Sequence, residues 1–212
     1  MQHAVTSCPW IRDTLQWTNE LGVLMKRSGK YKAMFLAICA STESDNPHPT
    51  AIKLLCHTRW LCRLPAIQSA LDNYPAILQS LNEMAEVGVT KTATKANGLL
   101  DRFQKGHTLL GLKITAKPVA LLEQLNGALQ GKSAYVSGML EDVKISSEHI
   151  MAQRSDEAFH EILTAAKEKC EEYDLDHLRY HEDEAHQEDT QVKRHSINLP
   201  VLKNTTGSSI LS

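Results

Sequence analysis

The sequence predicts an all-α fold, a bundle of about six to seven helices followed by a disordered acidic and polar C-terminal tail. Apolar residues recur at steps of three and four along most of the chain, which is typical of packed amphipathic helices. Aromatic residues make up only 5% of the 212 residues, and no strand-rich block is visible. The apolar pattern ends near residue 174, where acidic residues and histidines take over.

Each expected helix is supported by its own apolar stripe. The first stripe contains Ile11, Leu15, Leu21 and Met25. The expected helices cover residues 10–25, 31–40, 67–85, 92–112, 118–129, 133–153 and 155–173. Residues 41–50 are expected to form a loop because they combine two prolines with small polar residues. Residues 52–60 are compatible with either an extended segment or the start of a helix.

Prolines and one serine predict where several helices begin. Pro75 interrupts the stripe of residues 67–85, so it should kink that helix or start a new one at Tyr74. Pro118 suits the first turn of a helix that follows residue 112. Ser155 is a good N-cap for the final helix, in which residues 159–173 form the most regular stripe of the chain.

Charge is distributed unevenly although the net charge is only −2. Residues 1–63 contain eight Lys and Arg against four Asp and Glu, whereas residues 168–189 contain two against ten. A basic front and an acidic end indicate different surroundings for the two ends of the chain.

Cysteine and histidine spacing predicts free thiols and no metal site or cofactor. The five cysteines are odd in number and include no CxxC pair. Cys56 and Cys62 near His57 match no common zinc spacing. His177 and His181 share a helical face, but they lie in an acidic stretch that reads better as a solvated tail.

Two groups of residues could contact nucleic acid. Arg59 and Trp60, with His57 and Arg63 close in sequence, could hold phosphates and stack on a base. The basic turn Lys26, Arg27, Lys30 and Lys32 could contact a phosphate backbone. The plainer interpretation is a Trp buried at a helix edge and a solvated turn between two helices.

The chain resembles hAT-type DNA transposases and the proteins derived from them, especially the zinc finger MYM-type group. Residues 17–32, WTNELGVLMKRSGKYK, are similar to the family's NELGxFFKRSGKxK stretch. Residues 55–63, LCHTRWLCR, are similar to the stretch that contains its Thr-Arg-Trp signature. Shorter matches lie at residues 66–67, 71–74, 129–130 and 154–159.

The resemblance implies that residues 1–50 correspond to the end of the family's first RNase H-like half and residues 51–178 to its helical insertion. Residues 179–212 are the disordered tail that composition predicts. The Asp, Asp and Glu that hold metal in the family have no counterpart in this chain, so we expect no catalytic activity. Arg59 and Trp60 match the family's Arg-Trp pair, which implies contact with a distorted or flipped base at a transposon end.

These observations lead to two hypotheses. The first is a nuclear, non-catalytic, transposase-derived fragment with residual DNA binding, for transposon-end-like or distorted duplexes. The second is a helical protein-interaction module, nuclear or cytoplasmic, that binds a partner or itself through an apolar helical face, above all residues 159–173. No apolar run is long enough to span a membrane.

Overall fold

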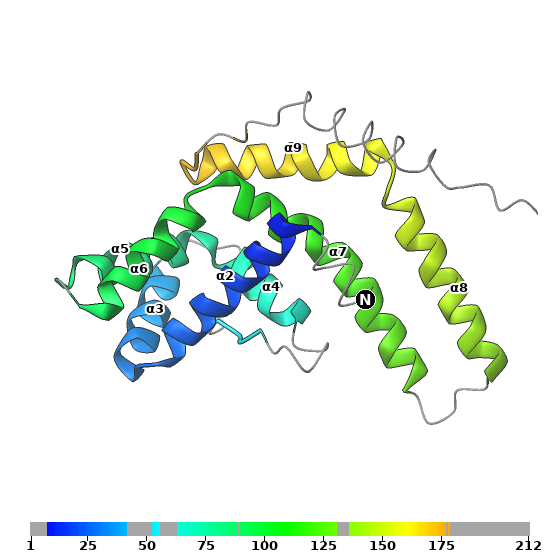
Figure 1. The fold of residues 1–212 in the computed structure, drawn as a ribbon, viewed down its shortest axis with the longest axis horizontal. Coiled ribbons are helices and arrows are strands. Elements are labelled where there is room, and N and C mark those ends of the chain that lie inside the picture. Colours follow the sequence, from blue (N-terminus) through cyan, green and yellow to red (C-terminus); the bar gives the residue numbers. More distant parts are fainter. Residues whose placement is uncertain are drawn as a thin grey trace, which may run out of the picture. The chain divides into compact units, whose positions relative to one another are not determined.

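The computed structural model describes residues 8–41, 52–55, 63–88, 90–130, 136–176 and 178. All regular elements within these residues are α-helices (Figure 1). The all-α prediction is therefore confirmed. The helices are α2 Pro9–Lys26, α3 Gly29–Ser41, α4 Arg63–Asp72, α5 Tyr74–Glu86, α6 Lys91–Phe103, α7 Gly106–Leu129, α8 Val136–Ala152 and α9 Asp156–Glu172. The tail expected in residues 179–212 lies outside the described residues.

Helix α7 is the centre of the arrangement, because α2, α4, α6, α8 and α9 all contact it (Figure 1). Its first half supplies fully buried leucines, among them Leu109, Leu110 and Leu112. Helices α5 and α6 pack against each other, and α3 joins them through α5. Burial of each such leucine contributes roughly 1.5–3 kcal/mol to the stability of the fold.

The first helices share this core with the later ones. Helix α2 contacts α4, α6 and α7, and α3 contacts α5. Residues 1–178 accordingly form one compact unit. The boundary expected near residue 50 therefore does not separate two cores among the described residues.

Several local predictions match the observed helix ends. A new helix does begin at Tyr74, one residue before Pro75, so the proline occupies the first turn, where its missing N–H costs nothing. The Ser155 side chain caps α9 by accepting a hydrogen bond from the backbone N–H of Ala158, at 3.2 Å.

The expected break at Pro118 was wrong, because α7 continues through this proline to Leu129. The break lies earlier, at Gln104 and Lys105, where the backbone pairs with Asp176 instead of continuing a helix. The Asp176 N–H donates to the Gln104 carbonyl at 2.9 Å, and the Gly106 N–H donates to the Asp176 carbonyl at 3.2 Å. A long-range contact thus sets the boundary between α6 and α7.

Two glycines allow close packing around α7. A Cβ added at Gly111 would lie 2.7 Å from Thr14 Oγ1 of α2, and one at Gly106 would lie 2.9 Å from Cys170 Sγ of α9. Because real Cβ atoms do not approach this closely, the two crossings depend on glycine.

Candidate basic site at the end of helix α2

The residues of the proposed Arg-Trp contact are only partly within the described structure. His57, Arg59 and Trp60 lie outside the described residues. Arg63 is the first residue of α4 and is buried, with 6% of its surface exposed. Burial also lowers the pKa of Arg63. The expectation of a phosphate contact at Arg63 therefore does not fit, since a phosphate on a duplex needs an exposed cation.

The second predicted group forms an exposed basic turn, made of Lys26, Arg27, Lys30 and Lys32. Helix α2 ends at Lys26, and the Arg27 N–H bonds back to the Leu24 carbonyl at 3.2 Å. The Ser28 hydroxyl oxygen then accepts from the Lys30 N–H at 3.2 Å as α3 begins. Among the described residues, none of the four cations pairs with a carboxylate.

The segment 52–55 adds a lysine that sequence reasoning did not assign to the site. Lys53 lines a hollow of about 240 Å³ together with Lys26 and Lys32. Its position is set by two contacts, because the Lys53 N–H donates to Ser69 Oγ at 3.2 Å and neighbouring Leu54 lies close to Gly22. The sequence held no signal for this grouping, since only the fold brings Lys53 beside the basic turn.

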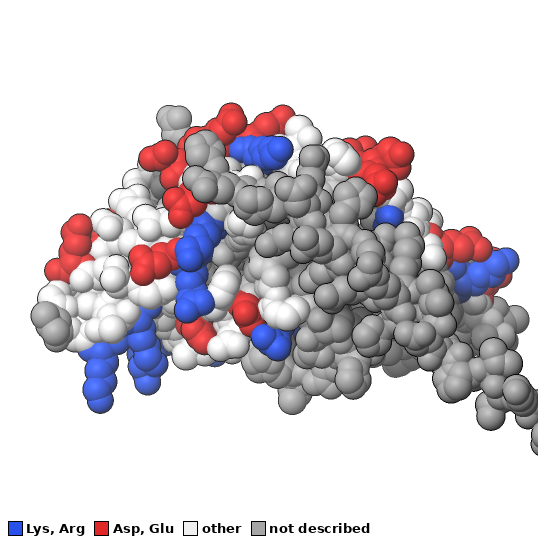
Figure 2. Space-filling view, turned by 45° about the horizontal axis from the view of Figure 1, so that its top comes forward, with Lys and Arg blue, Asp and Glu red and all other residues white. Residues whose placement is uncertain are grey.

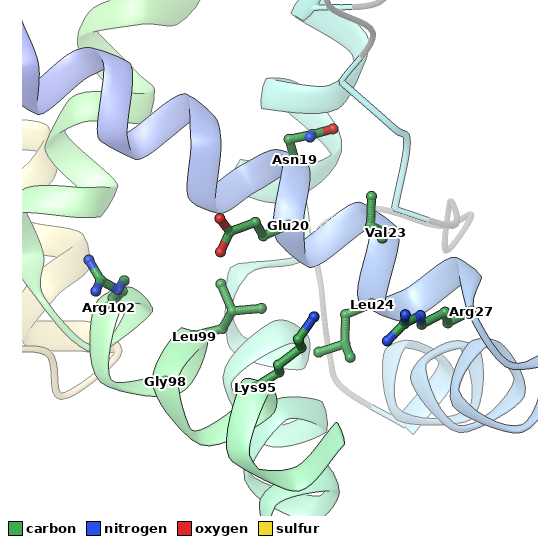
Figure 3. A pocket seen from close by; sticks show the side chains of 9 residues that line it. All are labelled: Asn19, Glu20, Val23, Leu24, Arg27, Lys95, Gly98, Leu99 and Arg102. Carbon is green, nitrogen blue, oxygen red and sulfur yellow. The ribbon is translucent and has the colours of Figure 1, made fainter. Parts of the chain in front are cut away.

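A larger hollow, of about 440 Å³, lies between α2 and α6 (Figure 3). In the close-up view Leu24 of α2 and Lys95 and Leu99 of α6 point toward one another across it, whereas Asn19 points away from α6. Its lining comprises Asn19, Glu20, Val23, Leu24 and Arg27 of α2, and Lys95, Gly98, Leu99 and Arg102 of α6. Three cations and one carboxylate thus surround a partly apolar floor, and we name this feature the α2/α6 hollow.

Two of the charged groups in the α2/α6 hollow are held in place. The Arg102 guanidinium lies over the Trp17 ring, 4.7 Å from its centroid, in a cation–π contact. The Glu20 carboxylate accepts a hydrogen bond from Gln16 Nε2 at 2.9 Å. Lys95 and Arg102 are seven residues apart on α6, a spacing that places them on one face, but no sequence pattern showed that this face lies beside α2.

The surface view shows acidic and basic side chains on the same face (Figure 2). Acidic side chains are frequent along the upper edge and basic side chains project at the lower left, but both kinds also lie between these regions and a basic group lies on the upper edge. Helix α9 supplies many exposed carboxylates, including Glu157, Glu161 and Glu168. The end of α2 is therefore the better place for an anionic ligand.

The apolar stripe of residues 159–173 is not a free partner surface, which corrects the second hypothesis. Helix α9 packs against α7, and its residues Leu163, Ala166 and Cys170 are buried. Helix α8 is the exposed one, since none of its described side chains is buried and Leu140, Val143 and Met151 are between 45% and 67% exposed.

Other site classes find little support in the described part of the chain. No three His, Cys, Asp or Glu side chains there are grouped so that they could hold a metal ion. Cys8, Cys39 and Cys170 are free thiols, and burial raises the pKa of Cys39 and Cys170. Among the described helices, none combines the length and hydropathy that a membrane crossing requires. Cys56, Cys62, His177 and His181 lie outside the described residues.

Comparisons with known proteins identified no similar protein. No protein-family model, no curated protein and no solved structure matches this chain.

Proposed function

We propose that this chain is a non-catalytic, hAT transposase-derived fragment that binds DNA through its basic turn, with Arg59 and Trp60 as a second contact. One observation carries the proposal. Lys26, Arg27, Lys30 and Lys32 are all exposed at one helix junction and pair with no carboxylate among the described residues. Lys53 extends this surface across the smaller hollow.

The physical reason is counterion release. Cations that are not already neutralised by carboxylates can replace the counterions condensed on DNA, and this favours binding most at low salt. Trp60 and Arg59 would add stacking and a bidentate grip, which a distorted or hairpin-ended duplex offers better than a regular one. A DNA ligand would place the chain in the nucleus.

The test is a salt-titrated binding assay of the full chain on hairpin-ended and plain duplex DNA. Replacement of Lys30 and Lys32 by Ala should reduce the salt slope by about 1 for each lysine that contacts a phosphate. Trp60→Ala should weaken binding to the hairpin end by roughly 1–3 kcal/mol.

The matched control replaces Lys117 of α7 and Lys144 of α8 by Ala, because both lysines are exposed but distant in sequence from the basic turn. This control should leave affinity and salt slope nearly unchanged. Equal losses in the two double variants would show that binding follows net charge and not the basic turn, and the proposal would fail.

A second candidate function is a helical protein-interaction module that binds no nucleic acid. It is favoured by the exposed apolar residues Leu140, Val143 and Met151 of α8, which follow helical spacing. The same DNA assay separates the two candidates, since a folded chain that fails to bind DNA at low salt would leave only this one.

A further inference from the structure

The α2/α6 hollow differs from the basic turn in what it offers a ligand. Besides Arg27, Lys95 and Arg102, it contains the carboxylate of Glu20 and the side chain of Val23, which is 48% exposed. Glu20 disfavours any anion placed beside it, so the negative groups of a ligand would lie at Lys95 and Arg102, and a phosphate backbone has no apolar group to cover Val23. The hollow therefore fits a ligand that carries both negative charge and an apolar side chain.

The spacing of the cations indicates the form of that ligand. Lys95 and Arg102 are seven residues apart in α6, which is two helical turns or roughly 10 Å along the axis. Gly98 and Leu99 lie between them and form the floor. A second helix presents side chains at the same interval on one face, so two of its carboxylates could meet Lys95 and Arg102 while an apolar residue between them covers Val23.

Gly98 supports close approach of such a helix. A Cβ added there would meet no atom within 4 Å, so the fold itself does not require glycine at this position. Glycine in a helix costs roughly 0.5–1 kcal/mol relative to alanine. The absence of a side chain does, however, leave the α6 backbone open to a partner that lies in the hollow.

We infer that the α2/α6 hollow binds an acidic, amphipathic helical peptide segment of a partner protein. The carboxylates of the peptide pair with Lys95 and Arg102, and an apolar side chain of the peptide covers Val23, since Leu24 and Leu99 are already buried in the core. This binding is independent of the DNA proposal and gives the protein-interaction candidate a defined site. Arg27 is the one residue that the hollow and the basic turn have in common.

The test uses a fluorescent, glutamate-rich synthetic peptide of about four helical turns with leucines on one face, and measures its binding to the full chain by anisotropy. Gly98→Leu fills the floor and should weaken binding at least tenfold, or about 1.4 kcal/mol. Gly127→Leu is the matched control, because Gly127 of α7 also has open space around its Cβ position and does not line the hollow.

Two further comparisons define the ligand class. Lys95→Glu with Arg102→Glu should weaken binding by roughly threefold or more per reversed charge, and a peptide with its leucines replaced by serines should bind more weakly than the original. The double variant Lys30→Ala, Lys32→Ala should leave peptide binding unchanged. Failure of the peptide proposal can therefore be told apart from failure of the DNA proposal.

Three results would overturn the inference. The first is no peptide binding by the folded chain. The second is equal binding of the leucine and serine peptides, which would indicate charge attraction alone. The third is binding of a single-stranded oligonucleotide that Gly98→Leu abolishes and Gly127→Leu does not. That result would assign the hollow to nucleic acid.

Discussion

Tyr74 connects three parts of the fold through one side chain. It is fully buried at the start of α5, and its hydroxyl donates to the Phe103 carbonyl of α6 at 2.7 Å. Its ring stacks on that of Tyr173, which follows α9, with ring centroids 5.9 Å apart. Burial raises the pKa of Tyr74 far above its usual value of 10.0. The phenol is thus a neutral hydrogen-bond donor at all moderate pH values.

Replacing Tyr74 by Phe should lower the free energy of unfolding at pH 7 by about 1–3 kcal/mol. The reason is that the Phe103 carbonyl would be left without this donor inside the core. Urea unfolding measures the loss. A variant as stable as the parent would show that the carbonyl finds another donor.

Comparing the parent protein with Tyr74→Phe also predicts how stability depends on pH. Above about pH 10 the unfolded chain ionises Tyr74 while the folded chain keeps it neutral, so the unfolded state binds fewer protons and stability falls as pH rises. The slope from this group approaches about 1.4 kcal/mol per pH unit. The stability difference between the parent and Tyr74→Phe should therefore shrink above pH 10, and a constant difference would contradict the burial argument.

At the scale of elements, close helix crossings depend on single glycines. Gly111→Ala should destabilise the protein by roughly 1–3 kcal/mol, because its Cβ would lie 2.7 Å from Thr14 Oγ1 and α2 would have to move away from α7. Thermal unfolding followed by circular dichroism measures this change.

Gly127→Ala is the control for Gly111→Ala, since both positions are in α7. Nothing lies within 4 Å of a Cβ at Gly127, so this change should raise stability by about 0.5–1 kcal/mol through helix propensity alone. Equal effects of the two substitutions would mean that the α2–α7 crossing is looser than its geometry indicates.

Helix positions could be predicted well because their causes are local. Pro75 and Ser155 mark helix starts by backbone and capping chemistry that operates within one turn. Pro118 misled the prediction for a tertiary reason. A proline inside a helix costs about 3 kcal/mol, from the lost backbone bond and the clash of its ring with the preceding turn, and burial of neighbours such as Val119 offsets this cost.

At the scale of the whole molecule, residues 8–41 share one core with the helices that follow residue 63. Unfolding should therefore be a single transition. In a Trp60→Phe variant the two remaining tryptophans, Trp10 and Trp17, are both on α2, and their fluorescence should change at the same urea concentration as the far-ultraviolet circular dichroism of all helices. An earlier fluorescence transition would indicate that α2 and α3 form a separate unit.

The candidate site was predictable only in part. The basic turn was found because its four cations are close in sequence, so proximity required no knowledge of the fold. Lys53, Lys95 and Arg102 were missed because each becomes part of the site only when segment 52–55 or α6 packs beside α2. The burial of Arg63 could not be predicted for the related reason that burial is a property of the assembled core.

The sequence by itself determined the helical class of this protein, the approximate bounds of most helices and the location of its basic turn, because periodicity, capping and charge act over a few residues. Only the tertiary structure decided that α7 runs through Pro118, that the α9 stripe is buried and that the α2/α6 hollow combines cations with an apolar floor. Those features depend on which faces meet, and contacts between residues far apart in the chain leave no local pattern in the sequence.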